Sequence, residues 1–234
     1  LEHKLIRILH EKSFIDDATR IWRALRYEQR LDFQLEPDTL KLLKRDTPML
    51  ATITGDRIRY ELECIFHEER PEKVLRRAGE LRVLKQLHPR LNGNGWLKSR
   101  FELARQLTSP RPPFDLYLAL LAYRLTNNEA EQLISYLRLP KPVAQVLRHT
   151  LVIKTKLRFL ARPRLKPATI YHLLDGYVPL AIMANLVASD STIVRQHIEL
   201  FLTQLRYIKT SLTGKDLVAL GIAPGPQIKE VLQL

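Results

Sequence analysis

The chain has 234 residues, 45% of them apolar, enough for a buried core in one large domain or in two to three small ones. Lysine and arginine number 38 against 25 acidic residues, which gives a formal charge of +13. This excess indicates a polyanionic partner, and a helical scaffold for protein partners would leave the charge unexplained. The single cysteine, Cys64, excludes an internal disulfide, and no apolar stretch approaches the roughly 20 residues of a membrane span, so we expect a cytoplasmic protein.

The chain contains only 8 glycines, and its apolar residues recur at spacings of three and four, which predicts an all-α fold without a confident strand. Prolines 37, 48, 71 and 167 stand where helices are expected to begin, since a first helical residue needs no amide donor. Boundaries near residue 80 and near residues 163–167 divide the chain into segments 1–80, 81–165 and 166–234. We expect an elongated multi-helix molecule.

The clearest helix runs from about Asp16 to Arg30, with Ser13 as its expected cap. Asp17 and Arg20 are three residues apart, so a helix places both on one face and sets a carboxylate acceptor beside a planar donor fork. Taken alone, the two residues are expected to form an exposed ion pair.

A second helical segment places Arg57 four residues before Glu61. These side chains can form an ion pair along one helix, which is a common arrangement.

The stretch 132–174 contains no acidic residue, although solvated helical faces usually mix both signs of charge. A surface of this kind suits the phosphate backbone of a nucleic acid, and the alternative is a solvated helix face. The expected contacts are Arg148, Lys154, Lys156, Arg158, Arg162 and Arg164.

Near the C-terminus, the segment beyond Asp190 predicts a long amphipathic helix followed by a hairpin of two short ones. Gly221 is placed to end one helix and Pro226 to begin the next. The turn between them, with Lys215 nearby and Gly225 within it, is either a phosphate site at a helix N-terminus or a tight turn that only closes the last helices.

The chain lacks the usual catalytic signals: it has no Asp-x-Asp pair, no Gly-Ser, no Cys-x-x-Cys, no His-x-x-x-His and no glycine-rich phosphate loop. A metal-dependent phosphoryl transferase needs carboxylates that converge on two metal ions, and the neighbouring Asp16 and Asp17 diverge on a helix. We therefore expect no catalytic and no metal-binding residue in this chain.

Segment 13–27 (SFIDDATRIWRALRY) resembles the neck of class II tRNA nucleotidyltransferases and bacterial poly(A) polymerases, where an acidic pair precedes Arg and a later Arg-Ala. Segment 55–62 (GDRIRYEL) is similar to a second neck motif of that family, and segments 212–217 and 220–226 are similar to its tail. Asp32 stands where the family usually has glycine. The resemblance spans nearly the whole chain, although residues 100–210 match only in helical character and loose pattern.

The resemblance implies that segment 1–80 is a nucleotide-selecting neck, 81–165 an RNA-binding body and 166–234 a tail. It implies nucleotide contacts at Asp17, Arg20, Arg23, Arg57 and Glu61, with the last two bracing the neck. Cytosine and adenine both present an amino donor beside a ring-nitrogen acceptor, so Asp17 can accept from the amine while Arg20 donates to the ring nitrogen. Uracil and guanine present an acceptor in place of the amino donor and a donor in place of the ring acceptor, so the buried polar groups of the protein are left unpaired.

The resemblance further implies that the partners are tRNA or a tRNA-like RNA and, together with a catalytic head outside this chain, CTP or ATP. Mg²⁺ is then held by that head, and this chain alone is inactive. The alternative function is a stand-alone helical module that binds nucleic acid through a helix-hairpin-helix-like C-terminus.

Overall fold

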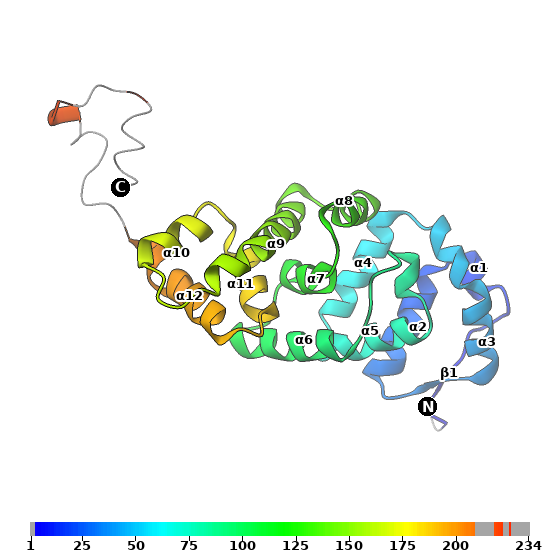
Figure 1. Cartoon of the computed structure of the whole chain (residues 1–234). Coiled ribbons are helices and arrows are strands. Elements are labelled where there is room, and N and C mark those ends of the chain that lie inside the picture. The colour runs from blue at the N-terminus through cyan, green and yellow to red at the C-terminus, as the bar shows by residue number, and fades with distance from the viewer. Residues whose placement is uncertain (1–2, 209–217, 222–224, 226–234) are drawn as a thin grey trace.

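The computed structural model of the chain describes residues 3–208, 218–221 and 225. Within them, twelve α-helices follow one another along an elongated molecule, from α1 and α3 at one end to α10 and α12 at the other (Figure 1). The prediction of an all-α fold is confirmed. The elements of the N-terminal part are β1 (Leu5–Ile6), α1 (Ser13–Asp16), α2 (Thr19–Arg30), β2 (Gln34–Leu35), α3 (Pro37–Asp46), the 3₁₀ turn η1 (Thr47–Thr52), α4 (Gly55–Phe66) and α5 (Pro71–Glu80).

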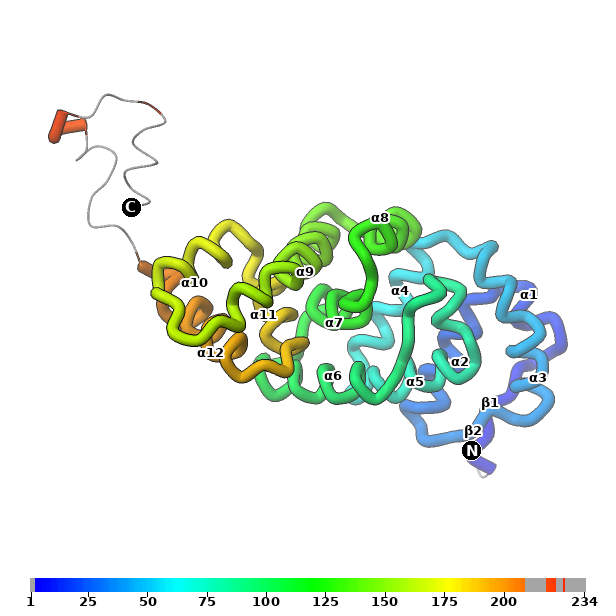
Figure 2. Tube along the Cα trace, viewed as in Figure 1, coloured from blue at the N-terminus to red at the C-terminus, as the bar shows by residue number. Residues whose placement is uncertain are grey.

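The later elements form the other end of the molecule in Figure 2. They are η2 (Leu84–Gln86), α6 (Gly95–Leu107), α7 (Phe114–Ala122), α8 (Asn127–Tyr136), α9 (Lys141–Leu160), α10 (Pro167–Leu174), α11 (Pro179–Ala188), α12 (Thr192–Thr203) and η3 (Leu205–Tyr207). The helix α12 is the one expected beyond Asp190. The hairpin expected after it lies largely outside the described residues.

Two short strands form the part of the fold that was not expected from the sequence. β1 and β2 pair in parallel, with Leu5 opposite Gln34 and Ile6 opposite Leu35. The pair ties the segment before α1 to the loop after α2. With only two residues in each strand, it leaves the architecture helical.

Local signals set most helix ends. Prolines open α3, α5 and α10 as expected, and Pro48 lies at the start of η1. A capping box opens α8, where the Thr126 side chain accepts from the Glu129 amide and the Glu129 carboxylate accepts from the Thr126 amide. These ends are specified by neighbouring residues alone.

Three helices end in a residue of left-handed backbone conformation that is not glycine. Asp32 follows α2 with φ 54°, Arg82 follows α5 with φ 61°, and Arg138 follows α8 with φ 49°. In each case the next amide donates back to a carbonyl five residues earlier, as from Phe33 to Glu28. Glycine is favoured in this conformation because it has no Cβ. The geometry explains why the related family usually carries glycine where this chain has Asp32.

The core is continuous along the molecule. Helices α7 and α11 are buried over most of their length and pack against each other and against α9. An aromatic cluster of Phe66, Phe101 and Tyr117 joins α4 to α6 and α7, with the rings of Phe101 and Tyr117 4.4 Å apart. Helix α4 is therefore anchored in the core on one side, and its other side is available to α2.

Candidate functional site

Helices α2 and α4 are joined by a row of ion pairs. Residues in or just before α2 pair, in chain order, with residues in or just after α4, so the two helices run in the same direction. The pairs are Asp17–Arg57 (3.0 Å), Arg23–Glu61 (2.7 Å) and Arg26–Glu68 (3.1 Å). We call the surface along these pairs the α2–α4 face, and it carries both segments that the sequence singled out.

The expected helix from Asp16 to Arg30 is wrong in its first turn. The chain forms the short helix α1 up to Asp16, passes through Asp17 in an extended conformation, and begins α2 at Thr19. Asp17 therefore does not share a helix face with Arg20, and Ser13 does not cap α2. The physical reason is local, because the Asp17 carboxylate accepts hydrogen bonds from the amide of Thr19 (3.1 Å) and its hydroxyl (2.7 Å) at the start of α2.

The Asp17 carboxylate is fixed from two sides. Its Oδ1 accepts from Thr19 and also from Nη2 of Arg57 in α4. Burial raises the pKa of Asp17, but the Thr19 hydrogen bonds and the Arg57 charge outweigh it and hold the pKa below the usual aspartate value. Asp17 is thus a preorganised acceptor that stays ionised near neutral pH.

Arg20, in the first turn of α2, does not pair with this carboxylate. Its Nη1 donates to the backbone carbonyl of Ser13 (3.1 Å), while Arg57 is the arginine that bonds to Asp17. A guanidinium has five N–H donors, so this one bond leaves Arg20 able to donate elsewhere. The simple ion pair between Asp17 and Arg20 is therefore not what the structure shows.

Arg57 and Glu61 do not pair with each other along α4 but reach across to α2. Glu61 is only 2% exposed and accepts from Nε of Arg23, whose side chain is 42% exposed. The pKa of Arg23 is raised chiefly by its hydrogen bond to Glu61, against burial, with smaller contributions from Asp17 and Tyr27. Four of the five residues expected at the nucleotide site thus lie in the ion pairs that join α2 to α4, and the fifth, Arg20, lies in the first turn of α2.

Two exposed tyrosines on this face were not predicted from the sequence. Tyr27 in α2 is 41% exposed, with the guanidinium of Arg26 4.6 Å from its ring centre, and Tyr60 in α4 is 60% exposed. The sequence places Tyr27 next to Arg26 and Tyr60 next to Glu61. These neighbours indicate that the two tyrosines share a surface only once it is known that α2 packs on α4.

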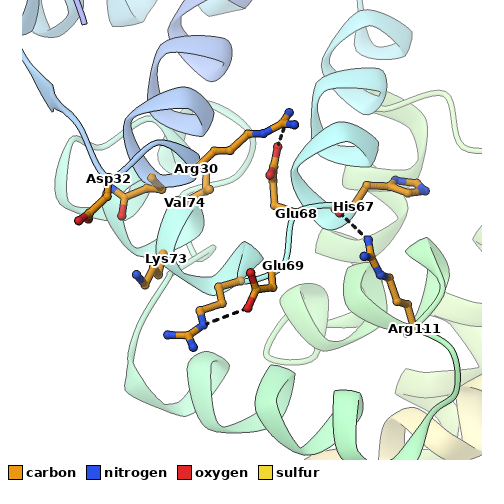
Figure 3. Close-up of a pocket in the computed structure, with 10 residues that line it drawn as sticks. Arg30, Asp32, His67, Glu68, Glu69, Lys73, Val74 and Arg111 are labelled. Carbon is orange, nitrogen blue, oxygen red and sulfur yellow. Dashed lines mark hydrogen bonds and ion pairs between the residues drawn. The ribbon is translucent and has the colours of Figure 1, made fainter. Parts of the chain in front are cut away.

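A polar groove opens at the C-terminal ends of α2 and α4. A cavity of about 580 Å³ in this groove is lined by Arg30, Glu68, Glu69, Arg70, Lys73 and Arg111 among others. In Figure 3, Glu68 points toward Arg30 and Arg111 toward the backbone of His67. Glu69 lies 3.9 Å from Arg70. A smaller cavity of about 360 Å³ shares Arg30, His67 and Glu68 with it and extends to Tyr60, so the groove continues onto the α2–α4 face.

The basic residues expected to bind phosphate fall into two groups. Arg148 is paired with Glu131 (2.6 Å), Lys154 donates to the Tyr123 carbonyl (2.6 Å), and Lys156 lies 3.4 Å from the Leu173 carbonyl. Burial, and to a smaller extent Arg124, lowers the pKa of Lys154. These three side chains have partners within the protein.

The other group is exposed at the end of α9 and in the loop that follows it. Arg158 and Arg162 flank the ring of Phe159 at 4.7 and 5.6 Å, and Arg164 follows in the loop. Among the described residues, no carboxylate pairs with any of these three arginines. We call Arg158, Arg162 and Arg164 the α9 arginine cluster.

The tail residues are mostly outside the described part. Lys215 lies outside it, and of the turn Gly221–Pro226 only Gly221 and Gly225 are described. Gly221 has φ 92° and its amide donates to the Val218 carbonyl, as expected where a helical turn ends.

Comparisons with a family model and with related proteins agree with the family resemblance of the sequence motifs. Residues 32–93 match a family model described as the probable RNA and SrmB-binding site of polymerase A. An A-adding tRNA nucleotidyltransferase of Geobacter sulfurreducens is 30% identical over 257 residues, covering 99% of this chain and 28% of that protein. One of Halalkalibacterium halodurans is 28% identical, covering 100% of this chain and 55% of that protein.

Solved structures agree. A CCA-adding enzyme with ATP is 27% identical with a TM-score of 0.79, over 99% of this chain and 58% of that one. The Thermotoga maritima CCA-adding enzyme in a complex with tRNA-CCA is also 27% identical, with a TM-score of 0.77, over 99% of this chain and 59% of that one. The chain fits a C-terminal part of the class II tRNA nucleotidyltransferase and poly(A) polymerase family. It spans between about a quarter and six-tenths of the length of these relatives.

Two further features bear on what a chain of this family can hold. Within the described ranges, no group of three or more His, Cys, Asp or Glu side chains is arranged to bind a metal ion. In the same ranges no single helix is long and apolar enough to cross a membrane, and α10 with α11 reaches that length only as a pair bent by 112°. Most residues of α11 are buried against other helices.

Proposed function

We propose that this chain is the nucleotide-selecting and RNA-binding part of an enzyme that adds C or A to the 3′ end of tRNA or a tRNA-like RNA. The relatives named for A addition and for CCA addition support it, as does the grouping of Asp17, Arg20 and Arg23 on the α2–α4 face. The observation that carries it is the fixing of Asp17 by Arg57, a residue forty positions away.

In the proposed selection step, Asp17 and Arg20 read the pairing edge of the incoming base. Oδ1 of Asp17 is occupied by Thr19 and Arg57, and within the described part of the chain Oδ2 has no hydrogen-bond partner. Oδ2 accepts from the amino group of cytosine or adenine, while Arg20 donates to the neighbouring ring nitrogen. Uracil and guanine present a carbonyl and an N–H at these places, which leaves the acceptor and the donor unpaired.

Arg57, Glu61 and Arg23 act as a brace in this proposal. The buried Glu61 fixes Arg23, and Arg57 fixes Asp17, so the selecting residues keep one geometry before the nucleotide arrives. A fixed acceptor does not lose conformational freedom on binding.

In the proposed division of labour, residues 1–80 select the nucleotide while residues 81–165 and the tail 166–234 hold the RNA. The α9 arginine cluster supplies phosphate contacts, with Lys215 and Gly225 as further contacts in the tail. Catalysis belongs to a head domain of the parent enzyme, which works in the cytoplasm with CTP or ATP and holds the divalent metal, Mg²⁺. The described residues fit no metal themselves, and this chain alone is expected to extend no RNA when it is incubated with tRNA, CTP, ATP and Mg²⁺.

The RNA-binding part of the proposal is tested by tRNA affinity at several salt concentrations. Replacing Arg158, Arg162 and Arg164 with Glu should weaken binding to all tRNAs and make the salt dependence shallower, because fewer phosphates are neutralised. Lys154 and Lys156 are left unchanged, since their bonds to backbone carbonyls would confound the result.

A matched control removes the same positive charge at the other end of the molecule, through Lys4, Lys12 and Lys41 to Glu. Equal losses of affinity in both triple variants would show that only net charge matters and would overturn the α9 arginine cluster as a binding site. Affinity that is insensitive to both salt and substitution would overturn RNA binding itself.

A further inference from the structure

The two tyrosines on the α2–α4 face are exposed aromatic rings with arginines nearby. Tyr27 is 41% and Tyr60 is 60% exposed, so part of each ring is open to a ligand. Arg26 lies 4.6 Å from the Tyr27 ring centre, and Arg23 stands one helical turn before Tyr27 in α2. Aromatic rings interleaved with arginine are typical of surfaces that bind unpaired nucleic acid bases.

We call the surface from Asp17 along α2 to the groove the path. Tyr60 lines a cavity of about 360 Å³ together with Arg26 and Arg30 of α2, and Tyr27 directly follows Arg26 in that helix. That cavity opens through Arg30 and His67 into the larger groove beside Arg70 and Lys73. The path begins at Asp17, and α2 with its twelve residues makes it about 18 Å long, the length of roughly three nucleotides in an extended strand.

The charges along the path suit phosphates despite several carboxylates. Glu61 is buried and paired with Arg23, and Glu68 is paired with Arg26 at 3.1 Å and lies 3.9 Å from Arg30. The groove then carries Arg70, Lys73 and Arg111 against Asp32 and Glu69. After the internal pairs are formed, cations outnumber carboxylates at the groove.

We propose that single-stranded RNA binds along the α2–α4 face, with its bases stacked on Tyr27 and Tyr60. Its phosphates contact Arg30, Arg70 and Lys73 in the groove. The strand is the unpaired 3′ end of the RNA, whose last nucleotide lies at the Asp17 end, because stacking on the two rings needs bases that are not paired. This inference rests on the proposed RNA-binding function and adds to it a site separate from the α9 arginine cluster.

The test compares two RNAs with this chain: a hairpin duplex with a four-nucleotide single-stranded 3′ overhang, and the same hairpin with a blunt end. The expected preference for the overhang is about tenfold in Kd. The double variant Tyr27→Ala with Tyr60→Ala should lose that preference and keep the blunt-end affinity. The double variant with Phe at both positions should keep the preference, since stacking needs the ring and not the hydroxyl.

Tyr207→Ala is the matched control. Tyr207 is 63% exposed and lies 4.7 Å from the guanidinium of Arg206, so it resembles Tyr27 in chemistry but is at the far end of the molecule. This variant should retain the full overhang preference. Thermal unfolding of each variant checks that the fold is intact.

A second readout reports stacking directly. 2-Aminopurine placed in the overhang should lose fluorescence on binding to the unsubstituted chain and to the Phe variant, and should stay bright with the Ala variant. If the overhang preference or the quenching survives both Ala substitutions, or if the unsubstituted chain shows no overhang preference, the stacking site is overturned. In those cases RNA binding through the α9 arginine cluster still stands if its Glu variant weakens binding to both RNAs. If no RNA binds at all, both proposals fail.

Discussion

The arginines of the α2–α4 face and those of the α9 arginine cluster carry the same charge but are held in different ways. On the α2–α4 face, Arg23, Arg26 and Arg57 each bond to a carboxylate that comes from the other side of the pair of helices. At the end of α9, Arg158 and Arg162 are supported only by the ring of Phe159.

This difference separates two kinds of recognition. A guanidinium held by a buried carboxylate keeps one orientation and can support the reading of a base edge, where an error of about 1 Å loses the hydrogen bond. Cations without a partner carboxylate can follow a phosphate backbone, whose charges carry no sequence information. In the proposed function, the same residue type therefore serves specificity in one region and affinity in the other.

The largest effect is expected on the free energy of unfolding, from removing the arginine that pairs with the buried Glu61. Arg23→Ala leaves the Glu61 carboxylate buried without its partner, which should lower the free energy of unfolding by about 3 kcal/mol. Chemical denaturation with a constant m-value measures it.

Arg148→Ala is the control, because Arg148 makes two short bonds to Glu131 but both side chains are 49% exposed. That change should cost less than about 1 kcal/mol. Equal costs for the two variants would show that burial does not distinguish the two regions.

A smaller effect is expected on nucleotide choice in the full-length parent enzyme. Asp17→Ala and Arg20→Ala each remove half of the proposed acceptor and donor pattern, so discrimination against UTP and GTP should fall by about 2 kcal/mol, or roughly thirtyfold. The ratio of kcat/KM values for the four nucleotides measures it. Asp16→Ala is the control, since Asp16 is solvent-exposed and ends α1. Unchanged preference in the Asp17 and Arg20 variants would leave both residues with a structural role only.

The smallest effect concerns the backbone beneath the groove. Asp32→Gly should raise the free energy of unfolding by about 0.5 kcal/mol, because glycine adopts φ 54° without a steric penalty. Asp38→Gly, the same chemical change in the first turn of α3, should lower it by a similar amount. If Asp32→Gly is destabilising, the Asp32 side chain contributes an interaction that outweighs its backbone strain.

The sequence predicted the features that depend on neighbouring residues. The helical fold, the prolines that open α3, α5 and α10, and the family itself all follow from local patterns. The helical pattern of the sequence did not predict the break at Asp17. The Asp17 carboxylate accepts a hydrogen bond from the hydroxyl of Thr19, only two residues away, and the spacing of apolar residues does not reveal such a local bond.

The remaining errors of prediction come from contacts between distant segments. Nothing in the spacing of Arg57 and Glu61 shows that they reach Asp17 and Arg23 rather than each other, because that depends on how α2 packs on α4. Lys154 has the pattern of a surface cation, yet it is half-buried on the carbonyl of Tyr123. Charge and periodicity located these regions of the sequence, and packing decided which side chains remain available.

The shared direction of α2 and α4 has an electrostatic consequence. Each helix carries a partial positive charge of about half an elementary charge at its N-terminus, and antiparallel neighbours would place opposite partial charges together. Here both positive ends lie beside Asp17, which precedes α2 and bonds to Arg57 in the first turn of α4. The Asp17 carboxylate is thus the counter-charge for two helix dipoles as well as for Arg57. Replacing Asp17 with a neutral residue would therefore leave two positive helix ends and Arg57 together without a counter-charge.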